Sequence, residues 1–520
     1  MKPSRGVACL CATTVLSSVA GCAGGTTHPC GDGGDFVLAV PADPQNLDPH
    51  GSFGRIRANL QMSRLLYDPL VNIAAGGKPE AGLAKSWTAT GSKISFRLRN
   101  GVTCTDGKHL TASTVAANFT YVLNPKNSSS ARGTAVPADV KATADDATAT
   151  VTLRTSTPLA FLLSQLSTFG IVCPDGLKNR KSLIQGADGT GPYTLTKAAM
   201  GSEYRLARRP GYAWGPGGGP AGTPPRSIVV RVMENESTAA NLLLSGEVNA
   251  AAIRGTEQAR LRKAGLPAYP FREPSGQLWF NQRKGHLTAD EKLRTALVHA
   301  VDLGQVSDVA TQRSGVPSEG MLQEPLVCGA VPPTPLLAKP DLAAAESMLA
   351  ATGWRHAAGG WTRDGRPLKL TFIYLTSLGP TVKAAAELVE RTWRDFGADV
   401  TVKPLTDALF GTTLLSTGNW DVVWAVNYTL VPTHFMGYVS GAEPPDGTNF
   451  ACIHNGRYER LAAAGSEEAG CARWNDAEQN LFTSSSIVPL EDIKVPVFAK
   501  GATFTAGGGG LIVPTTIRVA

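Results

Sequence analysis

The chain has 520 residues, of which 42% are hydrophobic and 18% charged, and its formal net charge at pH 7 is +7. A chain of this length exceeds what one hydrophobic core usually supports, so two or more lobes are expected. Positive and negative charges are interspersed and no Lys/Arg block occurs, which argues against a nucleic-acid partner.

The chain begins with a basic head and a short apolar run. Lys2 and Arg5 precede about 14 mostly apolar residues, fewer than the roughly 20 that a membrane span needs. Such a leader indicates a secretory signal peptide over residues 1–21. It ends in a Val-Ala-Gly-Cys sequence at Cys22, which resembles a bacterial lipoprotein signal, where the Cys thiol takes a diacylglyceryl group and becomes the new N-terminus. We therefore expect lipidation of Cys22; the alternative is an ordinary exported protein with a Cys at this position.

Residues 22–35 are rich in Gly and Thr and cannot bury apolar surface, so they are expected to form a flexible tether. No later apolar run approaches 18 residues, which predicts that only the acylated N-terminus holds the protein on a membrane. Acyl chains contribute about 0.8 kcal/mol of membrane affinity per buried methylene. The expected location is the extracytoplasmic face of the cell membrane, with the folded body lipid-anchored there.

Six of the nine cysteines follow Cys22. They are Cys30, Cys104, Cys173, Cys328, Cys452 and Cys471. An even number in an oxidising compartment suggests disulfides, and six cysteines allow fifteen pairings. A zinc site is disfavoured because no two of the six lie two to four residues apart. Cys452 and Cys471 are close in sequence, and a bridge between them would stabilise the fold by roughly 3 kcal/mol.

The first half of the chain mixes strand and helix patterns. Residues 36–40 are expected to form a strand, followed by a turn-rich loop over 41–49. Periodicity further predicts strands over 94–98, 148–153 and 228–232 and helices over 60–66, 114–123 and 237–244. Gly246 is the expected stop of the last of these helices.

The second half predicts an α/β unit. Helices are expected over 293–301, 341–349 and 382–396, and strands over 370–374 and 400–402. Asp364-Gly365 predicts a hairpin turn, because these residues suit positive φ at both central positions. The order strand, helix, strand from about 368 to 402 predicts a pair of parallel strands.

Six blocks along the chain resemble one family, in the family's order. They lie at 78–87 (KPEAGLAKSW), 94–107 (ISFRLRNGVTCTDG), 189–193 (GTGPY), 209–215 (RPGYAWG), 244–249 (LSGEVN) and 293–302 (LRTALVHAVD). Together these blocks resemble the family 5 extracellular solute-binding proteins of ABC importers, which are dipeptide and oligopeptide binders. The resemblance extends over nearly the whole mature chain.

The resemblance implies an α/β fold of two lobes that face each other across a cleft and are joined by two crossing segments. The first lobe would span 36–273 and carry an extra subdomain, the second would span 274–492, and residues 493–520 would return to the first. A ligand that touches both lobes stabilises the closed form by its differential affinity for that form. We therefore expect hinge closure on ligand binding.

The implied function is capture of a peptide or peptide-like solute and its delivery to an ABC permease. The protein would act as a monomer, use no cofactor or metal, and catalyse nothing. A binding lipoprotein that senses a signal without transport is one alternative. A secreted hydrolase is another, although no His-Glu-x-x-His, Gly-x-Ser-x-Gly or Walker sequence occurs.

Peptide-binding members of this family place an Asp opposite the α-ammonium of the ligand, usually in an Asp-Pro pair shortly after a Trp. At the matching place in this chain Val431 precedes Pro432. A free peptide N-terminus is then a poorer ligand than a blocked peptide, an unusual amino compound, a saccharide or a siderophore. The alternative is that the family pattern aligns with a shift at this point.

Four residues of this stretch are the expected ligand contacts: Trp424, Asn427, Tyr428 and His434. Trp and Tyr offer apolar faces together with a hydrogen-bond donor, which suits stacking on a ligand. The alternative for Trp424 is ordinary core packing. For His434 the alternative is a histidine of the surface or the core.

The family layout also bears on the cysteines. It places Cys104 and Cys173 in one lobe and Cys452 and Cys471 in the other, so these two pairs are the expected disulfides. A Cys30–Cys328 bridge would then follow by elimination.

Overall fold

The computed structural model describes residues 34–520, except 45, 52–56, 75–76, 157, 159, 217–222, 323–326, 334–338, 428 and 468–469. The expected signal peptide, the lipidation site at Cys22 and residues 22–33 of the expected tether therefore lie outside the described residues, as do Cys30 and Tyr428. The tether was expected to reach residue 35, but Asp35 already belongs to the first strand. In the part that is described, no helix is both long enough and apolar enough to span a membrane.

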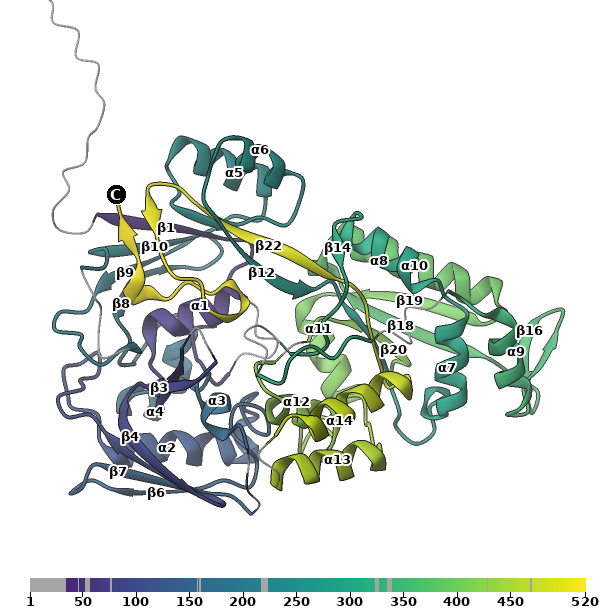
Figure 1. Ribbon diagram of the computed structural model, residues 1–520, viewed down its shortest axis with the longest axis horizontal. Helices are drawn as coiled ribbons and strands as arrows, with labels where there is room; N and C mark the ends of the chain where they lie inside the picture. Colours follow the sequence, from purple (N-terminus) through teal and green to yellow (C-terminus); the bar gives the residue numbers. More distant parts are fainter. Residues whose placement is uncertain are drawn as a thin grey trace, which may run out of the picture. The chain divides into compact units, whose positions relative to one another are not determined.

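The larger sheet contains eight of the described strands, in the order β12-β22-β11-β1-β10-β9-β8, with β14 paired to β22 (Figure 1). Their bounds are β1 (Asp35–Val40), β8 (Tyr193–Ala199), β9 (Glu203–Arg208), β10 (Ser227–Val232), β11 (Ala250–Ala252), β12 (Ala268–Pro274), β14 (Gly315–Val316) and β22 (Asp492–Ala499). Alternate residues of β1 face opposite sides. Phe36 and Leu38 pack with α1 (Arg57–Leu66), and Ala39 packs with α5 (Glu236–Ser245) and α6 (Glu257–Lys263).

A four-stranded antiparallel sheet forms a subdomain with its own core. Its order is β4 (Ala84–Thr90), β5 (Lys93–Leu98), β7 (Thr150–Arg154) and β6 (Lys141–Asp145). Ile94, Phe96 and Leu98 point inward and pack against Val115 and Phe119 of α2 (Ala112–Leu123). This arrangement agrees with the extra subdomain expected in the first lobe, which comprises the eight-stranded and four-stranded sheets.

The second lobe is built on a five-stranded sheet, in the order β19-β18-β20-β13-β21. The strands are β13 (Gln277–Phe280), β18 (Lys369–Leu375), β19 (Asp399–Leu405), β20 (Val422–Ala425) and β21 (Ile487–Pro489). One face packs against α7 (Glu291–His299), α8 (Leu303–Thr311), α9 (Leu342–Ala350) and α10 (Pro380–Asp395). The other face packs against α12 (Pro432–Val439), α13 (Gly456–Glu467) and α14 (Ala472–Thr483).

The remaining described helices and strands are short. They are α3 (Leu162–Leu166), α4 (Pro174–Lys178), α11 (Asp407–Thr412), β2 (Val71–Ile73), β3 (Pro79–Ala81), β15 (Arg355–Ala357), β16 (Gly360–Arg363), β17 (Arg366–Pro367), β23 (Ala502–Thr503) and β24 (Arg518–Val519). β16 and β17 form the hairpin expected at Asp364-Gly365, with Arg363 opposite Arg366.

The expected elements agree with these bounds to within a few residues. The predicted parallel pair is β18 and β19, which run parallel from Lys369–Asp399 to Leu375–Leu405. One boundary was placed too early: the strand expected from 148 begins at Thr150. Thr148 belongs to the turn, where its hydroxyl donates to Asp145, and Ala149 has a φ of +49°.

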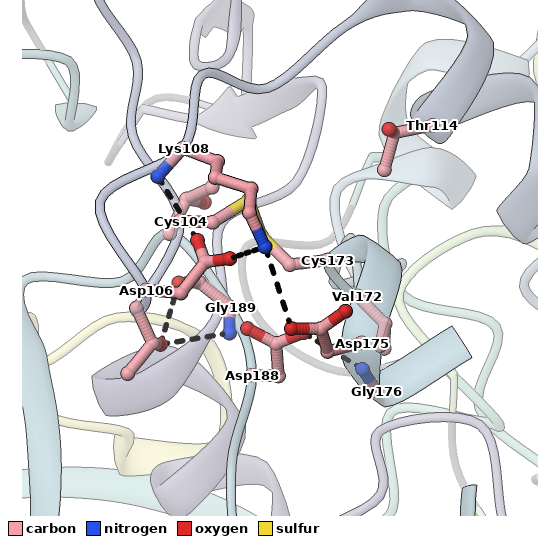
Figure 2. Close-up of a disulfide and its surroundings, with 12 residues drawn as sticks. Cys104, Asp106, Lys108, Thr114, Val172, Cys173, Asp175, Gly176, Asp188 and Gly189 are labelled. Carbon is pink, nitrogen blue, oxygen red and sulfur yellow. Dashed lines mark hydrogen bonds and ion pairs between the residues drawn. A yellow bond between two sulfur atoms is a disulfide. The ribbon is translucent and has the colours of Figure 1, made fainter. Parts of the chain in front are cut away.

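The expected Cys104–Cys173 disulfide is present and joins two segments 69 residues apart, with a Cα–Cα distance of 6.0 Å (Figure 2). It connects the turn after β5 to the N-cap of α4. Charged side chains surround it: Lys108 Nζ lies 2.6 Å from Asp106 and 3.6 Å from Asp175. The bridge therefore holds the subdomain to the segment that leads back into the larger sheet.

The expected Cys452–Cys471 bridge is wrong. Cys471 is bonded to Cys328 instead, with a Cα–Cα distance of 5.0 Å, and Cys452 is a free, buried thiol. Helix α13 explains the error, because its 12 residues separate Cys452 from Cys471 by about 18 Å of helix. Cys328 comes from a distant segment, and Asn475 of α14 holds its carbonyl through a 3.0 Å hydrogen bond. The Cys30–Cys328 pairing inferred by elimination falls with it.

Peptide mapping without reduction is expected to recover Cys104–Cys173 and Cys328–Cys471, with Cys452 alkylated only after unfolding. Replacing Cys328 and Cys471 by Ser should lower the free energy of unfolding by roughly 2–5 kcal/mol, because the bridge closes a long loop. Replacing Cys452 by Ser removes no bridge and serves as the control. Recovery of a Cys452–Cys471 peptide would contradict the observed pairing.

Candidate functional site

The two crossing segments, 275–276 and 490–491, link the larger sheet to the five-stranded sheet and are hydrogen-bonded to each other, and β14, which follows α8, pairs with β22 beside them. Ser275 N donates to Glu491 O over 3.0 Å, and Leu490 N donates to Gly276 O over 3.0 Å. β12 and β22, the strands that lead into these crossings, are paired. Two adjacent single-stranded links are a narrow connection between sheets, so we expect relative motion of the lobes to take place here.

Trp424 lies beneath the first crossing. Its side chain is fully buried in the core of the second lobe, and its indole Nε1 donates to Ser275 O over 3.3 Å. A Cβ on residue 276 would overlap the indole, so the ring packs against bare glycine backbone. Trp424 therefore supports the crossing as a core residue and does not present a ring face to a ligand, contrary to the sequence-based expectation.

A buried carboxylate lies at the second crossing. Asp492 Oδ2 accepts hydrogen bonds from Glu319 N at 3.2 Å and from Arg272 Nη2 at 3.3 Å. Arg272 also pairs with the Glu319 carboxylate at 3.1 Å, so β12, β22 and the segment after β14 are tied together. Burial is the main cause that raises the pKa of Asp492 to about 6, and Arg272 opposes this shift.

The lobes meet at a second place, which we call the inter-lobe seam: loop 131–136 and α3 from the first lobe, and α12 from the second. Helices α3 and α12 are in contact and lie side by side (Figure 1). Gly437 of α12 touches the backbone of Gly133, and a Cβ at 437 would overlap the Gly133 carbonyl oxygen. Arg132 reaches across the seam and donates from Nη1 to the Asp446 carbonyl.

Buried polar side chains lie on both sides of the inter-lobe seam. Gln165 of α3 is 1% exposed, and its Nε2 donates to Thr134 O in loop 131–136. Thr433, in the first turn of α12, is 2% exposed. Val431, the N-cap residue of α12, is fully buried and supplies no side-chain cap. The seam is therefore polar but contains no carboxylate at the position where the family resemblance led us to look for one.

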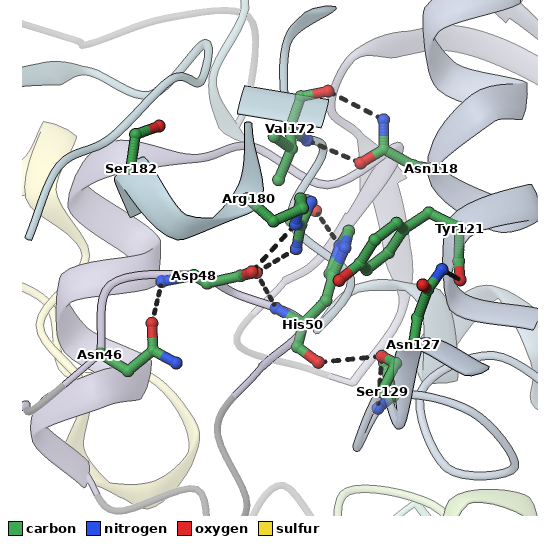
Figure 3. A network of polar contacts seen from close by, with 12 residues as sticks. Asn46, Asp48, His50, Asn118, Tyr121, Asn127, Ser129, Val172, Arg180 and Ser182 are labelled. Carbon is green, nitrogen blue, oxygen red and sulfur yellow. Dashed lines mark hydrogen bonds and ion pairs between the residues drawn. The ribbon is translucent and has the colours of Figure 1, made fainter. Parts of the chain in front are cut away.

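A polar network holds the first-lobe side of the seam in place (Figure 3). Asp48 accepts from Arg180 Nε at 2.9 Å and from His50 N at 2.8 Å, and burial raises the pKa of this carboxyl, opposed by the adjacent Arg180. The His50 ring stacks on Phe169 with centroids 4.6 Å apart. Ser129 Oγ donates to His50 O at 2.9 Å, which links the network to the start of loop 131–136.

The other expected contacts are placed as follows. Asn427 is half-buried, and its backbone exchanges two 2.9 Å hydrogen bonds with the Gln277 side chain of β13. His434 is 5% exposed in the first turn of α12, with its ring 6.4 Å from that of Tyr438. His434 therefore lies at the seam but inside the packed helix, and Asn427 lies on the loop that leads to it.

Sequence reasoning did not identify Arg132, Gln165, Thr433 or Gly437. Thr433 follows Pro432, and Pro at the first position of a helix is a usable signal that the next residues belong to the first turn. Gln165 and Gly437 carry no comparable signal, because they matter only through contacts with the other lobe.

One cavity, of about 290 Å³, lies away from the inter-lobe seam, at the edge of the four-stranded sheet. It is lined by Lys85, Arg99, Asn100, Gly101, Gly211, Ala213 and Trp214, all of the first lobe. Because it involves one lobe only, it cannot couple ligand binding to lobe closure. Among the residues with described positions, no cluster of three His, Cys, Asp or Glu side chains that could hold a metal ion is found.

Comparison with known proteins links this geometry to a family. A model of the bacterial extracellular solute-binding proteins, family 5, middle region, matches residues 78–444. Protein XP55 of Streptomyces lividans is 28% identical over 386 residues, which cover 69% of this chain and 67% of that protein. The nickel-binding periplasmic protein of Escherichia coli K12 is 28% identical over 392 residues, covering 71% and 70%.

A solved structure matches the fold. The substrate-binding protein of Microbacterium hydrocarbonoxydans, in complex with 4-hydroxybenzoate hydrazide, superposes with a TM-score of 0.77 and 26% sequence identity. The match covers 94% of this chain and 100% of that one. The two-lobed α/β architecture expected from the sequence is therefore confirmed.

Closure of the seam is expected to depend on Gly437. In Gly437→Ala the added Cβ would meet the Gly133 carbonyl, so the lobes should no longer reach the same contact. Small-angle scattering with saturating solute should then show an expanded protein, and solute affinity should fall at least roughly tenfold, about 1.4 kcal/mol.

Gly411→Ala is the matched control for this change. Gly411 also lies in a helix, α11, but nothing lies within 4 Å of an added Cβ there. Both substitutions gain similar helix propensity, of about 1 kcal/mol. Unchanged affinity and closure in Gly437→Ala would show that the contact with Gly133 is not needed in the closed state.

Proposed function

Because the chain belongs to the family 5 bacterial extracellular solute-binding proteins, we propose that it captures a peptide-like solute between its lobes and delivers it to an ABC permease. The observation that supports this proposal is that the lobes meet in two places. They are joined by two paired crossing segments, and they also meet at the inter-lobe seam, where polar side chains are buried. A solute held in that seam would contact both lobes and favour the closed form by its differential affinity. The protein binds and releases its solute unchanged.

The residues at the start of α12 support a narrower class of ligand, one without a free ammonium group. Two relatives show how varied ligands are at this level of similarity: one is named for nickel, and the other was solved with a hydroxybenzoate hydrazide. In this chain Val431 caps α12 without any charge. A buried ammonium needs a charged or strongly polar partner, so a free peptide N-terminus fits this place poorly. We therefore place a blocked or otherwise uncharged peptide-like solute in the site.

We further propose that Cys22 carries a lipid anchor, as its position after a basic and apolar leader indicates. Cys22→Ala should release the protein into the medium, while the wild type stays in the membrane fraction and carries the added mass of an acylated N-terminus. The pairing of mass spectrometry with fractionation separates lipidation from other reasons for membrane association. A Cys22→Ala protein that stays in the membrane, together with a wild type of unmodified mass, would refute the anchor.

Native mass spectrometry of protein purified from its source tests the function itself. A two-lobed binding protein should carry a small solute of defined mass, released on denaturation. Protein that carries no solute and shows no compaction with any peptide-like, saccharide or metal-chelate candidate would speak against solute binding.

Val431→Asp is expected to raise the affinity for free tripeptides such as trialanine at least roughly tenfold, because a carboxylate at the N-cap can pair with an ammonium and is supported by the helix N-terminus. The wild type should bind the same tripeptide poorly in calorimetry. Val431→Asn is the matched control, since it can cap α12 but has no charge. Equal gains in both variants, or tight tripeptide binding by the wild type, would show that position 431 does not set this preference.

A further inference from the structure

Residues 315–322, which we call the hinge strap, follow α8 of the second lobe and lie against a strand that leads into the crossings. Gly315 and Val316 of β14 pair with Ile493 and Asp492 of β22 (Figure 1). The strap is therefore joined to the larger sheet at the point where β22 leaves the crossing.

The middle of the hinge strap is fixed to β12 and β22 by polar contacts. Asp492 Oδ2 accepts from Glu319 N at 3.2 Å, and Arg272 Nη1 lies 3.1 Å from the Glu319 carboxylate. Arg272 also donates to the Pro317 carbonyl. A displacement of β12 or β22 that keeps these contacts therefore moves the strap with it.

The far end of the hinge strap is bonded to the loop that leads into α12. Thr429 N donates to Met321 O over 3.1 Å, and Leu322 forms a parallel bridge with Thr429. Thr429 is 2% exposed, and its hydroxyl donates over 3.2 Å to the carbonyl of Val431, the N-cap residue of α12. The strap therefore links β12 and β22 to the start of α12 by a route separate from the crossings.

One side chain of α14 holds the hinge strap between these two ends. Glu478 Oε1 accepts from Met321 N over 2.6 Å, and a Cβ on residue 320 would overlap the same oxygen. Gly320 has a φ of +109°, so the conformation and the available space both favour glycine where Glu478 approaches the backbone. Glu478 is 6% exposed, and no cation among the described residues is paired with it. A buried carboxylate without a cation is costly, so its ionisation is coupled to the position of the strap.

The protonation of Glu478 is sensitive to pH near neutrality. Burial is the main cause that raises its pKa to about 7, and the hydrogen bond from Met321 N opposes this shift. Among the described residues, Tyr458 is the titratable group that faces it from α13, and burial followed by the charge of Glu478 raises the pKa of Tyr458. Glu319 is the charged residue of the strap, and it is paired with Arg272.

The sign of the pH effect follows from the raised pKa. A Glu in water titrates at about 4.3, so between that pH and about 7 the closed strap holds a proton that an opened, hydrated strap has lost. The contribution of Glu478 to the closed strap is therefore fully present below about pH 4 and is lost as the pH rises through 7. Opening of the strap becomes more favourable up to about pH 7 and levels off above it.

We propose that the hinge strap transmits the position of β12 and β22 to the start of α12, and that Glu478 is the positioning residue that holds the strap while its carboxyl is protonated. A neutral carboxyl still accepts from Met321 N through its carbonyl oxygen. Loss of the proton favours opening of the strap and with it release of the loop at Thr429. This inference rests on the proposed function, since α12 forms one side of the seam proposed to hold the solute, and it adds control of that side by pH.

Hydrogen exchange of the free protein, resolved to single amides and corrected for the intrinsic effect of pH, tests this proposal. In the wild type, opening at the Met321 and Thr429 amides should increase roughly tenfold from pH 6 to pH 8. In Glu478→Gln the side-chain oxygen still accepts from Met321 N but does not titrate, so the increase should fall below about threefold. Asp492, with a pKa of about 6, accounts for such a remainder. The Glu319 amide, bonded to Asp492, should also be better protected at pH 8 in Glu478→Gln than in the wild type, because the strap opens as one unit.

Asp476→Asn is the matched control, because it removes a carboxylate from an exposed position of the same helix and should leave every profile unchanged. If Met321 responds to pH while Thr429 and Glu319 do not, Glu478 holds one amide only and transmission along the strap is refuted. A wild type without the pH dependence, or a Glu478→Gln protein that keeps it, overturns the role of Glu478. Because no solute is used, each of these outcomes leaves the proposed solute binding to its own test by native mass spectrometry.

Discussion

β12 and β22 pair along seven residues, from Ala268–Phe498 to Pro274–Asp492, immediately before both strands leave the first lobe. Because β12 and β22 stay paired up to the crossings, we expect any relative movement of the lobes to be taken up where these strands meet the crossings. Asp492, the first residue of β22, lies at this point. Its pKa of about 6 is well above the roughly 4 of an exposed Asp, so between those values the folded state holds a proton that the unfolded state has lost. The contribution of Asp492 to the free energy of unfolding is therefore fully present below about pH 4 and is lost as the pH rises through 6. The charge of Arg272 favours the ionised carboxylate and so partly offsets this loss.

At the inter-lobe seam Gly437 touches the backbone of Gly133, and Gln165 Oε1 and Thr433 Oγ1 are buried without a hydrogen-bond partner among the described residues. Each such atom costs about 1–3 kcal/mol of free energy while it has no partner. In the proposed function, a solute that pairs with these atoms would remove that cost when the lobes meet, and a ligand shifts an equilibrium only by such a difference in affinity.

Local sequence patterns were sufficient to predict most of the helices and strands. They did not predict the contacts between segments that lie far apart in the sequence. Alternation in Ile94, Phe96 and Leu98 identified β5, and the spacing of the β18–α10–β19 unit predicted a parallel pair. The Cys452–Cys471 proposal failed because closeness in sequence ignored the rigid length of α13. Trp424 was expected to contact the ligand because its stretch matches the family's ligand-binding segment and its ring suits stacking. Its burial beneath Ser275 depends on a crossing segment that no local pattern reveals. Gln165 was not identified from the sequence for the same reason. Its position at the seam depends on its hydrogen bond to Thr134 and on the second lobe, neither of which a local pattern shows.

At the start of α12, Val431 stands where the family pattern has an Asp. This difference changes the charge of the helix N-terminus and leaves the helix itself in place. The N-terminus of a helix carries a partial positive charge, and an Asp at the N-cap would both neutralise it and offer negative charge to a ligand. Val431 at the N-cap has no polar side chain to cap the helix, and Pro432 at the first helical position has no backbone N–H. Thr433, the next residue, is buried and its hydroxyl has no hydrogen-bond partner among the described residues. The proposed preference for an uncharged solute over an ammonium rests on this lack of negative charge at the start of α12.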